Sequence, residues 1–202
     1  MTLVKFCGMR RTEDILTVNE LKPDMVGFVL VPSRKRNVEI EDLMKMREIL
    51  LPEIKAVGVF VDEDINLVRD LLCRGIIDIA QLHGNESENY IKTLQDMTGK
   101  PLIKAFGVRT EKDLERACFS SADLVLLDSP GGGSGEGFDR EIIRDFKRPY
   151  ILAGGLDQTN VGEVLSLYSP YGVDVSSGIE TDGLKDPVKM RSFMTAVRKD
   201  IG

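Results

Sequence analysis

Three glycine-rich segments in the last third of the chain each follow a short apolar run. They are Asp128–Gly135, Ala153–Gly155 and Ser176–Gly178. Glycine has no Cβ, so its backbone N–H group can turn toward an anion and approach it closely. Three such breaks, each between an expected strand and an expected helix, predict an α/β enzyme that handles a phosphate group.

Short apolar runs that alternate with helical patterns must position these segments. The runs predict strands at Leu3–Cys7, Met25–Leu30, Lys55–Val61, Ile77–Leu82, Pro101–Phe106, Leu124–Leu127, Tyr150–Ala153 and Val173–Val175. The patterns between them predict helices at Thr12–Leu21, Ile40–Leu50, Ile65–Cys73, Glu88–Met97, Thr110–Cys118, Arg140–Phe146, Thr159–Leu167 and Pro187–Lys199. Strict alternation of strand and helix indicates a parallel sheet.

Eight strand–helix pairs fit a single-domain (β/α)8 TIM barrel over residues 1–202. The alternative is an open doubly wound sheet, which usually carries one dominant glycine-rich turn near its start. Here the glycine-rich segments follow the last three expected strands, and barrels often bind phosphate in the loops after strands seven and eight. This placement favours the barrel.

Composition narrows the classes of partner. The 202 residues carry a net charge of −6, which disfavours broad binding to nucleic acid or to an anionic membrane. No apolar run approaches the ~20 residues of a membrane span, and the first residues read as a strand rather than a signal peptide. Three scattered cysteines and one histidine make a zinc site improbable and predict free thiols in a reducing cytoplasm.

Side-chain parity gathers the polar strand residues at one end of the expected barrel. Successive side chains of a strand point to opposite faces, and the outward face must be apolar because it packs on helices. The polar residues that alternate with apolar neighbours are Lys5, Cys7, Gln81, His83, Lys104, Asp128, Asp174 and Ser176. We therefore expect these side chains to converge inside the carboxyl-terminal mouth.

Six motifs, in order along nearly the whole chain, closely resemble the phosphoribosylanthranilate isomerase family of tryptophan biosynthesis. The segments are Lys5–Gly8, Ser33–Arg36, Gln81–Gly84, Leu127–Ser129 with Gly132–Gly135 and Phe138–Asp139, Leu152–Leu156, and Gly172–Glu180. The resemblance implies an Amadori rearrangement of N-(5-phosphoribosyl)anthranilate to 1-(2-carboxyphenylamino)-1-deoxyribulose 5-phosphate. It also implies that neither a cofactor nor a metal takes part.

The resemblance assigns the general base to Cys7 and the general acid to Asp128. A nearby cation increases the thiolate fraction of a cysteine, and Lys5 lies on the same expected face as Cys7. Asp128 must carry a proton when it donates to the ring oxygen. Residue type alone leaves alternatives open, since an isolated cysteine is usually a small buried hydrophobe and an aspartate beside Ser-Pro-Gly often caps a turn.

The resemblance also assigns the substrate-binding residues. Arg36 would grip the anthranilate carboxylate, because a guanidinium suits a bidentate carboxylate contact, although Arg34–Arg36 also reads as a solvated charge run. The phosphate would be bound by Gly154, Gly155, Ser177 and Gly178. Glycines at 132, 133 and 135 would belong to a loop that closes over the substrate. Gln81, His83 and Asp174 face the mouth as supporting residues, His83 as a hydrogen-bonded residue and Asp174 as one that orients its neighbours.

Two other functions remain open at this point. A phosphoribosyl isomerase of histidine biosynthesis would share the phosphate site, but such enzymes typically use paired aspartates where this chain has Cys7 in the first strand. A non-catalytic barrel that binds a phosphometabolite would need neither Cys7 nor Asp128. We expect a small phosphosugar as the ligand and either a monomer or a homodimer.

Overall fold

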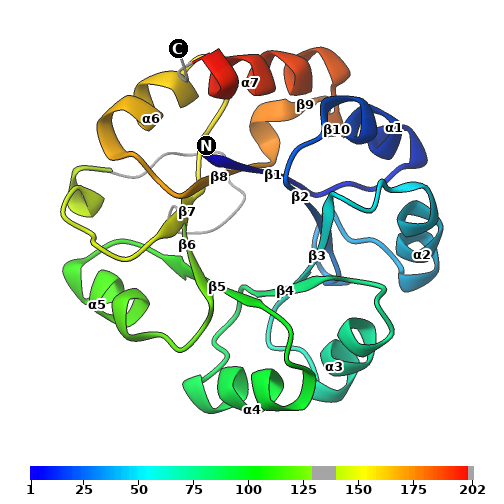
Figure 1. Cartoon of the computed structure of the whole chain (residues 1–202), viewed down its shortest axis with the longest axis vertical. Coiled ribbons are helices and arrows are strands. Elements are labelled where there is room, and N and C mark those ends of the chain that lie inside the picture. Colours follow the sequence, from blue (N-terminus) through cyan, green and yellow to red (C-terminus); the bar gives the residue numbers. More distant parts are fainter. Residues whose placement is uncertain (129–139, 200–202) are drawn as a thin grey trace.

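A computed structural model describes residues 1–128 and 140–199 of the chain. Eight parallel strands form a closed barrel, and helices surround it (Figure 1). The strands are β1 Leu3–Cys7, β2 Met25–Val29, β3 Lys55–Phe60, β4 Ile79–Leu82, β5 Leu102–Gly107, β6 Leu124–Asp128, β7 Tyr150–Leu152 and β8 Gly172–Val175. Each strand pairs with its neighbours in sequence, and β1 pairs with β8 to close the ring. The barrel expected from the sequence is confirmed.

Seven α-helices are present in the described part of the chain. They are α1 Thr12–Leu21, α2 Ile40–Ile49, α3 Ile65–Cys73, α4 Glu88–Thr98, α5 Glu111–Phe119, α6 Val161–Tyr168 and α7 Pro187–Lys199. Local chemistry explains several of their ends. The Ser87 hydroxyl accepts a hydrogen bond from the Tyr90 N–H at the start of α4, and Gly99 ends that helix with a φ of 61°.

The sixth expected helix, Arg140–Phe146, is wrong. The segment contains the 3-10 helix η1, Arg140–Ile143, and its N–H groups at Arg144 and Phe146 donate to carbonyls three residues earlier. Pro149 stands directly before β7 and disfavours helical geometry at Arg148. The chain therefore has little length in which to nucleate an α-helix before it must extend into β7.

The apolar core has two layers, one on each face of the barrel sheet. The inner layer fills the barrel and includes Met25, Val57, Ile103, Leu126 and Ile151. The outer layer lies between the strands and the helices, where Phe6 of β1 packs edge-on against Phe193 of α7 with ring centroids 6.1 Å apart. Strand parity thus separates inward from outward residues, as expected from a period of two.

Lys104 departs from the expected convergence at the mouth. Its neighbours Ile103 and Ala105 belong to the inner layer, so Lys104 starts from the outer face of β5. Its Nζ donates to the carbonyls of Leu82, at 3.3 Å, and Gly84, at 2.7 Å, and lies 3.0 Å from a carboxylate oxygen of Glu86. A long side chain with a charged end can satisfy its ammonium group in this way, so Lys104 braces the loop after β4.

A short hairpin follows β8 and was not expected from the sequence. The chain passes through the 3-10 helix η2, Ser177–Ile179, and then forms β9, Glu180–Thr181, and β10, Leu184–Lys185. Asp182 and Gly183, with φ of 52° and 75°, make its turn. Aspartate and glycine tolerate such angles, which is typical of tight hairpins. The hairpin lies between α7 and the loop that leads into α1 (Figure 1).

No helix in the described ranges is long and apolar enough to span a lipid bilayer.

We predict that Phe193→Ala lowers the free energy of unfolding by about 3–5 kcal/mol, because it leaves a cavity behind Phe6. Phe193 is fully buried. Urea denaturation followed by circular dichroism measures the change. Phe119→Ala is the matched control, since Phe119 is 84% exposed and its loss should change stability by less than about 0.5 kcal/mol. Equal effects of the two substitutions would contradict the packing described for α7.

Candidate active site

A cavity of about 640 Å³ lies at the carboxyl-terminal end of the barrel. Its wall includes residues at or just beyond the ends of all eight strands. Among the residues expected at the site, those lining it are Cys7, Arg36, Gln81, His83, Asp128, Gly154, Gly155, Asp174 and Ser177. Active sites of (β/α)8 barrels lie at this end, so the cavity is the candidate active site.

Cys7 stands at the end of β1 beside two charged groups of the barrel interior. Lys5, two residues earlier and fully buried, donates from Nζ to Asp174 Oδ1 at 2.7 Å, and its charge acts on the Cys7 thiol. Gly27 on β2 makes room for both groups, because a Cβ there would stand 2.7 Å from the Cys7 Sγ and 3.0 Å from the Lys5 Nζ. Sequence parity therefore identified a real cluster of thiol, ammonium and carboxylate.

Burial and nearby charges act against each other on the pKa values of Cys7 and Lys5. Burial raises the pKa of the Cys7 thiol, and it outweighs the ammonium group of Lys5, which lowers that pKa as expected. Burial acts in the opposite sense on Lys5, but the Asp174 carboxylate and the Cys7 sulfur outweigh it and the pKa of Lys5 is raised. The resting site thus favours a protonated thiol beside a charged lysine.

Lys185 is a second ammonium group near Cys7 that sequence reasoning missed. Its Nζ lies 2.7 Å from Glu180 Oε1 and donates to the Ser176 carbonyl at 2.9 Å. Burial lowers the pKa of Lys185, although Glu180 opposes this effect. The charge of Lys185 also lowers the pKa of Cys7. No sequence signal marked it, because β10 brings it to the site only through the hairpin.

Asp128, at the end of β6, is buried beside His83 and Gln81 of the β4 end. His83 Nε2 lies 3.5 Å from Asp128 Oδ2, and His83 Nδ1 lies 3.2 Å from Gln81 Nε2. If the amide of Gln81 donates to Nδ1, the ring carries its proton on Nε2, facing the carboxylate of Asp128. Within the described residues, Gln81 Oε1 is buried without a hydrogen-bond partner.

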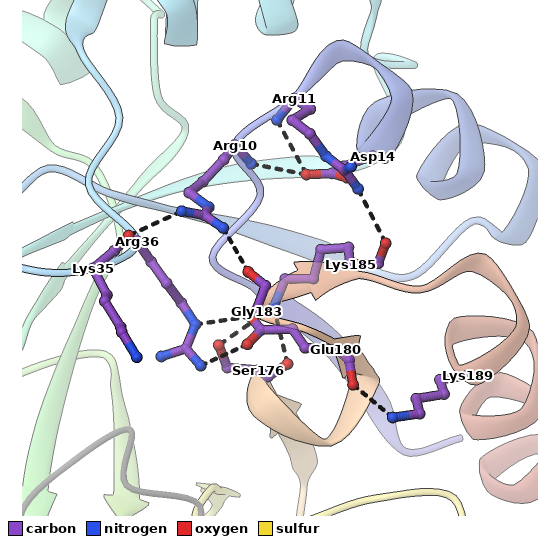
Figure 2. Close-up of polar contacts among 10 residues, drawn as sticks. All are labelled: Arg10, Arg11, Asp14, Lys35, Arg36, Ser176, Glu180, Gly183, Lys185 and Lys189. Atoms are coloured by element: carbon purple, nitrogen blue, oxygen red, sulfur yellow. Dashed lines mark hydrogen bonds and ion pairs between the residues drawn. The ribbon is translucent and has the colours of Figure 1, made fainter.

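Arg36 reaches the cavity from the loop after β2. Its Nε and Nη2 each donate to one carboxylate oxygen of Glu180, both at 2.8 Å, and the hydrogen bonds to Glu180 raise the pKa of Arg36. Figure 2 shows this fork between Arg36 and Glu180, with Lys185 beside it. Glu180 belongs to the matched motif after β8, yet its residue type alone gave no role.

The glycines expected to bind phosphate lie at two strand ends. Gly154 and Gly155 follow β7 with φ of 87° and 61°, angles that other residues rarely adopt. Gly178 lies in η2 beneath the loop after β7, where a Cβ would stand 1.9 Å from the Leu156 carbonyl oxygen. Gly178 supports this wall from outside the cavity lining, whereas Ser177 belongs to the lining. Gly132, Gly133 and Gly135 lie outside the described residues.

An apolar wall completes the cavity on the side of Arg36, and sequence reasoning did not single it out. Val29 of β2 and Val31 of the following loop line it, together with Val59 of β3 and Val61 directly after that strand. The pattern of apolar residues could have suggested this wall, because alternation along the strands places Val29 and Val59 on the inner face of the barrel, as it does Cys7. The wall suits a flat apolar group next to a guanidinium.

The fold and the cavity together define a (β/α)8-barrel protein with a thiol, carboxylates, a guanidinium and glycine turns around one opening. A family model for N-(5'-phosphoribosyl)anthranilate isomerase matches residues 4–196. The chain belongs to this family.

Individual relatives agree with the family match. The N-(5'-phosphoribosyl)anthranilate isomerase of Clostridium acetobutylicum is 42% identical over 207 residues, which cover 98% of this chain and 99% of the relative. The crystal structure of the Thermotoga maritima enzyme is 34% identical and superposes with a TM-score of 0.90, covering 98% of this chain and 100% of that one. The comparisons confirm the expected activity, isomerisation of N-(5'-phosphoribosyl)anthranilate in tryptophan biosynthesis.

Two further structures bear on ligand and assembly. One phosphoribosyl anthranilate isomerase, 34% identical with a TM-score of 0.88 and covering 98% of this chain and 100% of that one, was crystallised with reduced 1-(o-carboxyphenylamino)-1-deoxyribulose 5-phosphate. Another structure, also 34% identical with a TM-score of 0.87 and the same coverage, describes monomers generated from the dimeric Thermotoga maritima enzyme. The bound ligand and the dimer are properties of those two proteins.

We predict that Cys7 reacts with iodoacetamide as a thiol of raised pKa. The thiolate is the reactive form, so the alkylation rate should rise with pH and reach half its maximum above about 8.5, the ordinary pKa of cysteine. Cys73 and Cys118 are exposed, and both are first replaced by serine. Lys5→Met should move the midpoint higher still, because Lys5 lowers the pKa of Cys7. Mass spectrometry locates the adduct, and a midpoint below 8.5 would contradict the dominance of burial.

Proposed function

We propose that the cavity binds N-(5-phosphoribosyl)anthranilate across its whole width and rearranges it between Cys7 and Asp128. The observation that carries the proposal is that one cavity is lined by Cys7, Asp128, Arg36 and the glycines after β7. The substrate has a phosphate, a ribose and an aromatic acid in a row. The cavity wall has backbone N–H groups, an acid–base pair, and valines beside a guanidinium.

The two ends of the substrate are bound by different chemistry. We assign the 5-phosphate to the backbone N–H groups of Gly154, Gly155 and Ser177, which line the cavity, because such groups hold a dianion without a basic side chain. Gly178, expected from the sequence to bind the phosphate directly, is assigned the support of this wall instead. The anthranilate ring is assigned to the valine wall and its carboxylate to Arg36, whose guanidinium suits carboxylate geometry. The complex of a related isomerase with a reduced 5-phosphate product supports a ligand of this kind.

The reaction then needs one acid and one base. Asp128 protonates the furanose ring oxygen, and the ring C–O bond breaks as the nitrogen lone pair forms a Schiff base. Cys7, as its thiolate, removes the proton from C2, and the electron pair moves into an enolamine. The enolamine gains a proton at C1 and loses one from O2 to give the ketone. The enzyme is left with its proton on Cys7 instead of Asp128. Proton exchange with solvent then returns Cys7 to the thiolate and Asp128 to the protonated acid.

Neighbouring groups support each partner in its role. The Lys5 and Lys185 ammonium groups stabilise the Cys7 thiolate when it forms, and both lower the pKa of Cys7. Asp174 orients Lys5 through their 2.7 Å ion pair. His83 and Gln81 orient the Asp128 carboxylate on the opposite side. These assignments give supporting roles to Lys5, Asp174, His83 and Gln81.

The wider setting of the protein is also proposed. The three cysteines are unpaired, which supports a reducing cytoplasm. A single domain over residues 1–202 agrees with the closed barrel. The dimeric enzyme of Thermotoga maritima makes a homodimer one of two expected states, the monomer being the other, and sedimentation of the purified protein distinguishes them.

We predict that Cys7→Ala and Asp128→Asn each reduce kcat by about 10² to 10⁴, the usual contribution of a general acid or base. The substrate should still bind, because the phosphate and carboxylate contacts remain. The assay supplies anthranilate, phosphoribosyl pyrophosphate and the transferase that joins them, and it follows the loss of the intermediate's fluorescence. Cys73→Ala and Asp145→Asn, at exposed positions, are the matched controls. Near-normal turnover of either site variant would refute its assigned role.

A further inference from the structure

The guanidinium of Arg36 is held by one edge only. Glu180 accepts hydrogen bonds from Nε and Nη2 in a bidentate contact, each at 2.8 Å. Within the described residues Nη1 makes no hydrogen bond, and Figure 2 shows it on the side of the guanidinium away from Glu180. Because Arg36 lines the cavity, its free edge is the part that a ligand can contact.

Lys185 changes the electrostatic balance of this pair. Arg36 and Glu180 alone would be neutral, and the carboxylate of Glu180 would repel a ligand carboxylate nearby. Lys185 Nζ lies 2.7 Å from Glu180 Oε1, so the three residues carry a net charge of +1. We call Arg36, Glu180 and Lys185 the cationic triad. Arg36 and Lys185 keep the pKa of Glu180 at about 2, although its burial acts to raise it.

Further contacts hold the triad between three loops of the barrel mouth. Arg10, in the loop after β1, donates from Nη1 to the Lys35 carbonyl at 3.0 Å and from Nη2 to the Gly183 carbonyl at 2.5 Å. Arg11 donates to the Lys185 carbonyl at 3.0 Å. The hairpin carrying Glu180 and the loop carrying Arg36 are thus fixed to a common support (Figure 2). Such fixing reduces the conformational entropy that Arg36 loses when a ligand binds.

We propose that Glu180 is a positioning residue for recognition of the substrate carboxylate, and that Lys185 offsets its charge. Glu180 holds the guanidinium by one edge so that the other edge meets the carboxylate, and Lys185 keeps the triad attractive to an anion. This inference rests on the proposed function, which assigns the anthranilate carboxylate to Arg36. A merely structural ion pair would affect all ligands of the cavity alike, whereas a positioning role acts only on ligands that carry the carboxylate.

Two ligands isolate this effect. The first is reduced 1-(o-carboxyphenylamino)-1-deoxyribulose 5-phosphate, and the second is the same molecule with hydrogen in place of its carboxyl group. Isothermal titration calorimetry gives a Kd for each with the full-length protein. The Kd of the ligand without the carboxyl group, divided by the Kd of the carboxylated ligand, measures recognition of the carboxylate alone. The phosphate, the sugar and the ring are common to both ligands.

Variants separate orientation from charge. Glu180→Gln combined with Lys185→Met keeps the net charge of +1 and removes the bidentate contact, and it leaves no unpaired buried ammonium to destabilise the fold. Glu180→Asp keeps every charge of the cationic triad but shortens the side chain by one methylene, so it is the second test of orientation. Lys185→Met alone keeps the fork and neutralises the triad. Glu20→Gln is the matched control, because Glu20 makes a similar contact with Arg191 between α1 and α7.

The double variant and Glu180→Asp should each raise the Kd of the carboxylated ligand about tenfold, because the long side chain of Arg36 must then be ordered on binding. Affinity for the ligand without the carboxyl group should stay unchanged. Lys185→Met should also reduce the ratio, and Glu20→Gln should leave it as in the unaltered protein. The inference is overturned if the orientation variants keep the original ratio or lose affinity for both ligands equally. If Lys185→Met leaves the ratio unchanged, Lys185 does not offset the charge of Glu180 as proposed.

Failure of the proposed function would look different. The unaltered protein would then bind both ligands equally, or would not convert N-(5-phosphoribosyl)anthranilate in the fluorescence assay. A protein that is active and prefers the carboxylated ligand, but whose preference survives loss of the Glu180 fork, refutes the positioning role alone.

Discussion

The barrel closes at the seam between β1 and β8, and a buried ion pair crosses this seam. Lys5 and Asp174 are register partners of the two strands, and their side chains meet at 2.7 Å inside the barrel. A fully buried ammonium needs such a partner, because desolvation is costly for an unpaired charge. The charge of the same ammonium lowers the pKa of Cys7, although burial outweighs it. The seam of the barrel and the surroundings of the proposed base therefore share one interaction.

Much of the architecture was predictable, because strand period and glycine placement are local properties of the sequence. Eight apolar runs became eight strands, and parity placed Cys7, Gln81 and Asp128 around the mouth, with Lys5 buried inside the barrel. Predictions failed where a second constraint acted. Pro149 and the start of β7 limited the helix expected after Arg140, and Lys104 reached carbonyl groups at the mouth from the opposite face of its strand.

The site was predictable in residue type but not in its electrostatics. Sequence placed Lys5 beside Cys7, yet the direction of the pKa shift of Cys7 follows from burial, which requires the packed structure. Glu180 and Lys185 reach the site through a hairpin whose strands are two residues each, too short to give a periodic signal. The valine wall needed the strand register, which brings Val29 of β2 opposite Val59 of β3.

The cavity wall is divided among different strands in a way that matters for directed evolution. The valines belong to β2, β3 and the loops that follow them, whereas Gly154 and Gly155 follow β7 and Ser177 belongs to η2. β2 and β3 lie across the ring from β7 (Figure 1). Codon libraries confined to the β2 and β3 side would vary the accepted amine while the backbone around the sugar phosphate stays constant. The barrel thus allows the amine side of the cavity to be varied separately from the glycines after β7.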